Sequence, residues 1–83
     1  MKVGSIRRSE HGAILRLASG QVVSNNIYGF TPVVIDTYLL LERTTKGVEI
    51  YPGIPFWKVL SERYGIVYCQ EANLEQSSYE MME

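Results

Sequence analysis

Hydrophobic and polar residues alternate along much of the first half of this chain, which is the pattern of half-buried β-strands. Apolar or alternating stretches cover residues 2–8, 13–17 and 21–24. Between them, residues 9–12 and the dipeptide Ser19-Gly20 combine glycine with polar residues and therefore suit tight turns. The pattern predicts a three-stranded antiparallel meander with short connections.

The strongest strand signal lies in the middle of the chain. Residues 33–43 are rich in β-branched and large apolar side chains. Because β-branched side chains lose rotamer freedom in a helix, we prefer a strand to the alternative of a helix over 36–43. The turn-like residues 44–47 then lead into an alternating stretch at 48–51, so a β-hairpin is predicted here.

A helical period follows residue 53. One face of a helix would carry four large apolar residues at the spacing i, i+3, i+4 and i+8: Phe56, Val59, Leu60 and Tyr64. Pro55 suits a first helical turn, and Gly65 suits the position just after a helix. We predict a short helix over 55–64 and a final strand over 66–69.

The predicted fold class is a β-rich α+β domain. It has five to six short antiparallel strands, with one short helix at 55–64 before the last strand. Such a chain forms either a small half-open barrel, SH3-like or OB-like, or a sheet with the helix on one face. Residues 1–69 are expected to form a single globular domain. Residues 70–83 show neither period convincingly and are expected to form a largely flexible, acidic tail. The alternative is a weak helix around Leu74.

Composition agrees with a small globular domain. The chain has 83 residues, of which 46% are hydrophobic, and its net charge is −1. This charge divides into +3 over residues 1–69 and −4 over residues 70–83. No apolar run approaches the ~18 residues of a membrane-spanning helix, so no membrane contact is expected. A lone cysteine, Cys69, and an N-terminus without a secretory pattern point to a cytoplasmic protein.

The inventory of reactive side chains is too small for most enzyme sites. One histidine, one cysteine and one aspartate cannot build a zinc centre within one chain. A catalytic pair of Cys69 and His11 is disfavoured, because Cys69 ends an apolar strand and His11 falls in a predicted exposed turn. We expect no catalytic residue, metal or cofactor, and therefore no enzymatic activity.

Asp36 interrupts the apolar run of residues 33–41. On an alternating strand it is expected to face water. The alternative is a buried carboxylate with a partner, because an unpaired charge in the interior costs several kcal/mol.

Aromatic and arginine residues indicate a protein-binding module. Tyr28 and Phe30 surround a glycine in a predicted loop, and loops on rigid scaffolds often carry binding residues. Trp57 follows Phe56 and points away from it on the predicted helix, so it is a candidate contact; the alternative is that both pack in the core. With Arg7 and Arg8 as charged anchors, these residues predict a small adaptor with regulatory or self-associating contacts.

The alternative function is binding of single-stranded nucleic acid. A basic cluster falls on the first two predicted strands and comprises Lys2, Arg7, Arg8, His11 and Arg16, and Tyr28 and Phe30 could stack on bases. Arg7 and Arg8 could equally be edge-strand charges that prevent aggregation. The sequence pI of about 5.8 argues against nucleic acid, since such domains often exceed 9.

Overall fold

The computed structural model describes residues 1–25 and 34–81 of the chain. In chain order, the elements of the described residues are β1 (Ile6–His11), β2 (Ala13–Arg16), β3 (Val22–Asn25), β4 (Val34–Thr44), β5 (Gly47–Val48), β6 (Tyr51–Pro52), β7 (Phe56–Ser61), β8 (Gly65–Gln70), α1 (Glu71–Ser77) and β9 (Ser78–Glu80). No helix among them has the length and apolar character needed to cross a membrane.

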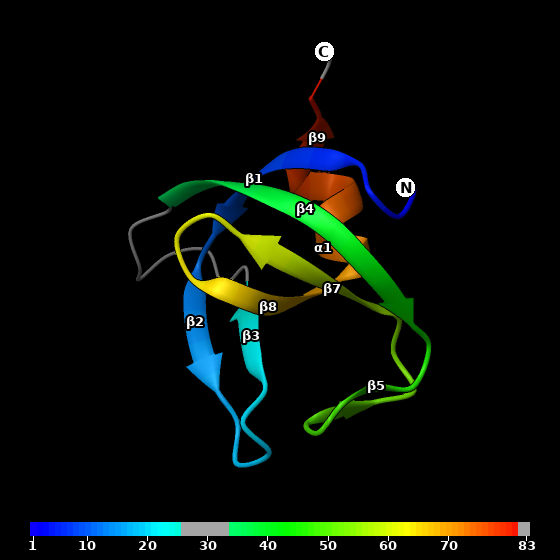
Figure 1. Ribbon diagram of the computed structural model, residues 1–83. Coiled ribbons are helices and arrows are strands. Elements are labelled where there is room, and N and C mark those ends of the chain that lie inside the picture. Colours follow the sequence, from blue (N-terminus) through cyan, green and yellow to red (C-terminus); the bar gives the residue numbers. More distant parts are fainter. Residues whose placement is uncertain (26–33, 82–83) are drawn as a thin grey trace.

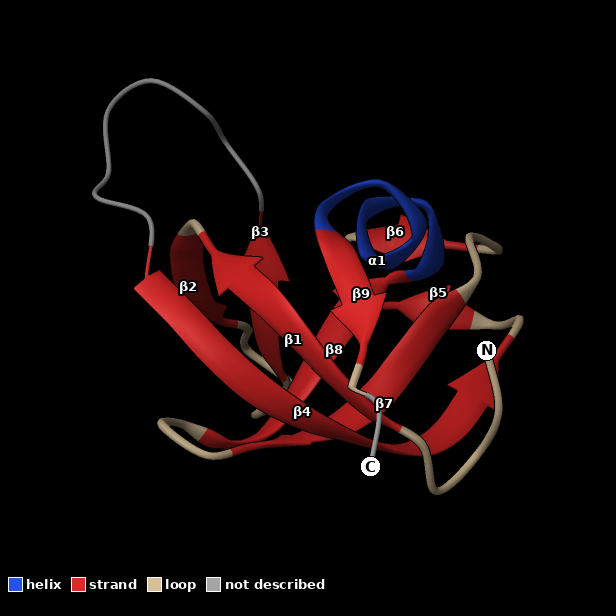
Figure 2. Ribbon diagram, turned by 90° about the horizontal axis from the view of Figure 1, so that it is seen from above, coloured by secondary structure: helices blue, strands red, loops and turns tan. Residues whose placement is uncertain are grey.

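Seven strands form one mixed sheet in the order β2-β3-β8-β7-β4-β1-β9 (Figure 1). Neighbouring strands are antiparallel except for the parallel pair β3 and β8. Strands β1 and β2 are separated by Gly12 alone, yet one pairs with β4 and the other with β3. The sheet is therefore strongly curled, with α1 packed against it (Figure 2). Within the described residues the strands do not close into a barrel.

The β-rich α+β class is confirmed, including one short helix before the last strand, but the predicted position of that helix is wrong. Residues 56–61 form strand β7, which lies between β4 and β8 and pairs with both. These two neighbours satisfy backbone groups on both sides of β7. The apolar spacing was misleading because Val59 faces the core while Leu60 faces outward, and a short apolar run fits either period.

The expectation of a flexible tail does not hold for residues 71–80. Helix α1 places Leu74 in the core, and β9 adds a strand to β1 at the edge of the sheet. One large apolar residue in a polar segment is a weak sequence signal. Its burial depends on a hollow that only the curled sheet creates.

The predicted hairpin of residues 33–43 with 48–51 is also wrong, although β4 is a strand as expected. Strand β4 pairs with β1 and β7, whereas β5 and β6 form a separate two-stranded hairpin. The β5–β6 hairpin requires glycine at position 47. Gly47 has a φ of +77°, and an added Cβ would lie 2.0 Å from the carbonyl oxygen of Tyr51.

The predicted meander is confirmed only in its second half. Strands β2 and β3 pair as an antiparallel hairpin, and Gly20 has the positive φ of +90° that its turn requires. Residues 9–11 do not form a turn. They continue β1, which therefore pairs with β4 instead of β2. This continuation carries His11 into the interior. Strand β8 is confirmed at residues 65–70.

The main core lies between the curled sheet and α1. Its buried members are Tyr38, Leu40, Trp57, Val59, Val67, Cys69 and Leu74. Burial of Cys69 was expected from its place at the end of an apolar strand. A second cluster of Val23, Val48 and Phe56 fastens the β5–β6 hairpin to the sheet.

Candidate functional site

Two features outside ordinary core packing could carry function: a group of polar side chains inside the molecule and an apolar surface outside it. The first, the buried polar cluster, consists of His11, Ser24, Asp36, Tyr38 and Ser61, which come from β1, β3, β4 and β7. The strand order brings these four strands together across the interior.

A hydrogen bond between His11 and Asp36 is the centre of the buried polar cluster. His11 Nε2 lies 2.6 Å from Asp36 Oδ2, and Asp36 is 3% exposed. The hydroxyl of Ser61 also donates to Oδ2, and the Thr37 N–H donates to Oδ1 at 2.7 Å. An ionised carboxylate only accepts hydrogen bonds, so this arrangement suits a charged Asp36 and a proton on Nε2 of His11.

The other ring nitrogen of His11 faces two hydroxyl groups. Nδ1 lies 2.8 Å from the Tyr38 hydroxyl and 3.0 Å from Ser24 Oγ. The rings of Tyr38 and Tyr64 both pack edge-on against the imidazole, at centroid distances of 4.9 Å. Every polar position of His11 is thus held, which fixes its ring orientation.

The two ends of the His11–Asp36 bond respond differently to burial. Burial lowers the pKa of His11 below its ordinary value of 6.5, and the contact with Asp36 offsets this only in part. Burial by itself would raise the pKa of Asp36. The hydrogen bonds from Ser61, Thr37 and His11 outweigh that effect and lower the pKa of this carboxyl below its ordinary range. The pair is therefore a neutral imidazole bonded to a carboxylate.

The order Asp36, His11, Ser24 resembles the acid–base–nucleophile relay of serine hydrolases. The space beside Ser24 argues against that chemistry in this conformation. Ser24 is 6% exposed, and the adjoining cavity of about 10 Å³ has room for about one water molecule. Burial also raises the pKa of the Cys69 thiol to about 12, so this thiol is not a nucleophile at neutral pH. The geometry is that of a structural polar network.

Acid should destabilise this protein through His11. Because the pKa of His11 is lower in the folded state, the unfolded state binds the proton first as the pH falls. The contribution of neutral His11 to the free energy of unfolding is complete above about pH 6.5. It is lost as the pH falls through the folded-state pKa of His11. Between about pH 7 and pH 5, we expect the free energy of unfolding to fall by up to ~1.4 kcal/mol per pH unit.

Urea unfolding at a series of pH values measures this slope, and an NMR titration of the ring protons gives the pKa directly. His11 is the only histidine of the chain, so His11→Gln should remove the slope over this range. A wild-type stability that is flat or rises towards pH 5 would contradict the assignment.

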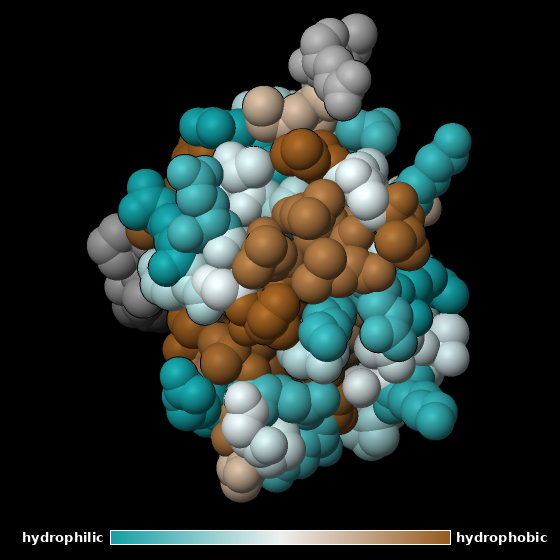
Figure 3. All heavy atoms as spheres, viewed as in Figure 1, coloured by the Kyte–Doolittle hydropathy of each residue, from teal (hydrophilic) through white to brown (hydrophobic). Residues whose placement is uncertain are grey.

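The second feature, the outer apolar row, is a line of side chains across four adjacent strands. Cross-strand pairing places Ile6 of β1 opposite Leu39 of β4, Leu39 opposite Leu60 of β7, and Leu60 opposite Ile66 of β8. Ile6, Leu60 and Ile66 are 43–44% exposed. Figure 3 shows hydrophobic surface gathered over β4, β7 and β8 on this side of the molecule. Contiguous apolar surface of this kind is typical of interaction sites.

Charged residues border the outer apolar row on both sides. Arg8 lies two residues beyond Ile6 on the same face and donates to Thr37 Oγ1 at 3.5 Å, and the Glu62 N–H bonds the Thr37 carbonyl. On the opposite side, Glu42 of β4 is paired with Lys58 of β7.

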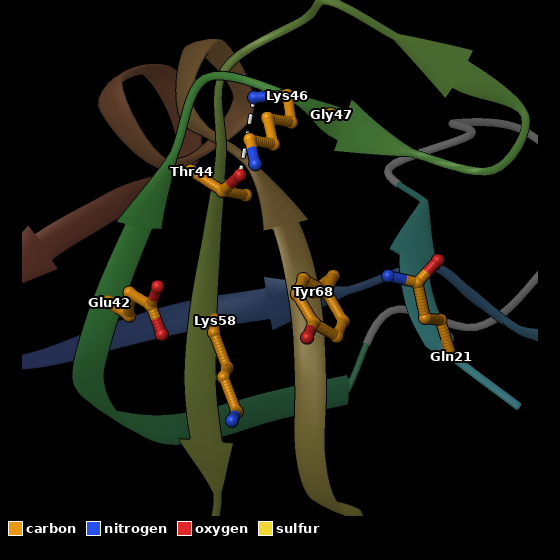
Figure 4. A pocket seen from close by; sticks show the side chains of 7 residues that line it. All are labelled: Gln21, Glu42, Thr44, Lys46, Gly47, Lys58 and Tyr68. Carbon is orange, nitrogen blue, oxygen red and sulfur yellow. Dashed lines mark hydrogen bonds between the residues drawn. The ribbon is translucent and has the colours of Figure 1, made fainter.

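An open cleft adjoins this second border. It has a volume of about 250 Å³ and lies between the sheet and the chain entering β5. Figure 4 shows the side chains that line it, among them Lys46, Lys58, Tyr68, Gln21 and Glu42. Two ammonium groups against one carboxylate give the cleft a small excess of positive charge. It is a candidate site for an anionic or aromatic group of a ligand.

No family model, no curated protein sequence and no solved structure is similar to this chain at a significant level. Within the described residues, no three His, Cys, Asp or Glu side chains are grouped closely enough to hold a metal ion. Function must therefore be inferred from the geometry of this chain.

The structure places the predicted contact residues in different environments. Trp57 is 3% exposed and donates its indole N–H to Glu71 Oε2 at 2.8 Å, while Arg43 binds the same carboxylate through two nitrogens. It is therefore a core residue that anchors α1, the alternative that the sequence had left open. A side chain in this position is not accessible to a partner.

The two arginines point to opposite sides of the sheet. The guanidinium of Arg7 bonds the hydroxyl and carbonyl of Ser78 at 2.7 and 3.0 Å, and so holds β9 in place. Arg8 is exposed beside the outer apolar row. Tyr28 and Phe30 lie outside the described residues, so their role stays a prediction.

The outer apolar row was not predicted from the sequence. A signal was present in β4, where Leu39, Leu40 and Leu41 form a continuous apolar run. A strand that is polar on one side alternates, whereas a continuous run indicates that both faces are to be covered. Leu40 is fully buried, and Leu39 belongs to the outer row.

Proposed function

We propose that this chain is a small binding module that acts through protein–protein contacts, with the outer apolar row as its contact surface and Arg8 as a charged contact beside it. The observation that supports this function is the line of Ile6, Leu39, Leu60 and Ile66 on the solvent side of the sheet. We further infer that the curled sheet is a half-open barrel, whose outer wall presents this row.

The energetics favour a covered surface. Full burial of a Leu or Ile side chain contributes about 1.5–3 kcal/mol, and three members of the row are still more than two-fifths exposed. Covering the row would recover about two-fifths of this stabilisation for each of these three side chains, at a surface that the sheet already forms. In this conformation, the buried polar cluster offers a substrate no comparable access.

The proposal predicts that Leu60→Asp abolishes specific protein contacts, because it places a charge in the middle of the apolar row. Leu15→Asp on β2 is a matched control, since Leu15 is 38% exposed and Leu60 is 43% exposed. Capture by photo-crosslinking from a cell extract measures the contacts, and thermal unfolding verifies that both variants fold. Equal capture by the two folded variants would contradict the assignment of the surface.

The cleft supports a second candidate, binding of single-stranded nucleic acid. Lys46 and Lys58 could contact phosphates, and Tyr68 could stack on a base. Fluorescence anisotropy with a labelled single-stranded oligonucleotide, at low and moderate salt, separates the two functions. Binding that weakens with salt and is lost in Lys46→Gln/Lys58→Gln would favour nucleic acid. Absence of binding at low salt would remove this candidate.

A further inference from the structure

We infer that the partner covering the outer apolar row is a second copy of this chain. The two copies would be stacked face to face about a twofold axis parallel to the row. This inference rests on the proposed function and names the partner of the same surface. A twofold interface requires one surface that is complementary to itself, in both apolar contact and charge.

The apolar part of the surface meets this requirement. The row crosses β1, β4, β7 and β8 through directly paired positions, perpendicular to the strands. An axis parallel to the row lays it along the same row of the other copy, so that leucines and isoleucines meet their equivalents or near neighbours. The four side chains of the row are all aliphatic. Covering the row therefore removes no polar side chain of it from water.

The charges at the two borders select this axis. Arg8 and Glu62 lie on one side of the row, next to Thr37, and Glu42 and Lys58 lie on the other. The axis exchanges the borders, which brings Lys58 of each copy towards Glu62 of the other and Arg8 towards Glu42. Among the described residues, none of these four side chains forms an ion pair within one copy.

The other simple arrangement has its twofold axis parallel to the strands. That axis would keep each border against the same border of the other copy. The row spans β1, β4, β7 and β8, so an axis through its middle would lay β7 on β4 and bring Lys58 of each copy to Glu42 of the other. Arg8 and Glu62 would then lie away from the opposite charges of this set, whereas the first arrangement pairs all four. The charge pattern therefore favours the first arrangement.

The size of the face sets the expected affinity. Four strands about 4.8 Å apart and six residues at about 3.3 Å each give a face of roughly 19 by 20 Å. A standard interface buries about 800 Å² on each partner, which is ~15% of the 5240 Å² surface of this chain. At roughly 380 Å² the face is about half the standard size, in the range of weak and transient contacts, and we expect a dimer with a dissociation constant in the upper micromolar range.

Sedimentation equilibrium of the full chain, from roughly 1 to 300 µM, spans this affinity range. We expect a reversible monomer–dimer equilibrium that Leu60→Asp abolishes. Lys58→Glu and Glu62→Lys should each weaken the dimer about tenfold or more, since each change occurs twice in a twofold dimer and creates like-charge contacts. The double variant Lys58→Glu/Glu62→Lys should restore the wild-type dissociation constant to within about threefold. Arg16→Glu on β2 is the matched control for charge reversal and should leave it unchanged.

A chain that is monomeric over the whole range would overturn the inference of a second copy. It would leave the proposed function standing if capture of another protein still depended on Leu60. A dimer that withstands Leu60→Asp would overturn the inference of a second copy on this row, because a different surface would then hold the copies together. The proposed function would be overturned as well if capture of other proteins also withstood Leu60→Asp. A Leu60-dependent dimer in which the double variant is no better than the single variants would overturn the proposed twofold arrangement.

Discussion

Asp36→Ala is expected to lower the free energy of unfolding by about 3–5 kcal/mol, the usual result of removing one partner of a buried polar pair. Three donors converge on this carboxylate: the imidazole of His11, the hydroxyl of Ser61 and the backbone N–H of Thr37. Alanine would leave all three in the interior without an acceptor. A domain of this size has a total stability of roughly 4–12 kcal/mol, so the loss would remove a large share of it.

Urea unfolding followed by the fluorescence of Trp57 measures this loss, because Trp57 is the only tryptophan of the chain and is buried. Glu42→Ala is the control on the same strand. Glu42 is exposed, and its removal should change the stability by no more than about 0.5 kcal/mol. An equally small loss of unfolding free energy in both variants would contradict the burial of Asp36. It would mean that Asp36 faces water, as the alternating pattern of the sequence suggested.

Removing residues 71–83 is expected to abolish cooperative folding. The truncated chain would lose Leu74 from the core, the Glu71 carboxylate that binds both Arg43 and Trp57, and the β9 strand that pairs with β1. Several core side chains would then face water where α1 had covered them. A flexible tail, as the sequence alone predicted, could be removed with little effect.

Leu74→Ala gives a graded version of the same test in the full chain. Truncating a buried leucine costs about 2–5 kcal/mol, because the apolar contact is lost and a cavity remains. Glu75→Ala changes the adjacent, exposed position of α1 and should be within about 0.5 kcal/mol of the wild type. Circular dichroism and urea unfolding of both variants make the comparison. Equal stabilities would mean that α1 does not cover the core.

The outer apolar row could not be predicted from residue types alone, and the reason is physical. Aromatic and arginine residues are enriched at interfaces, and that enrichment pointed to Trp57 and Arg7. In the folded chain both make internal bonds, to Glu71 and to Ser78 respectively. The outer apolar row is aliphatic, and its members are 6 to 33 residues apart along the chain from one strand to the next. Cross-strand register alone assembles them.

The sequence by itself determined the β-rich α+β class, the β2–β3 hairpin, the strand at β4 and the burial of Cys69. These follow from local causes, namely alternation, β-branching and turn residues, which act over a few neighbouring positions. Tertiary structure alone decided that residues 56–61 form a central strand and that residues 71–80 cover the core. It also decided that His11 and Asp36 meet inside the molecule. Those outcomes depend on strand order and register, which join residues far apart in sequence and cannot be derived from local preference.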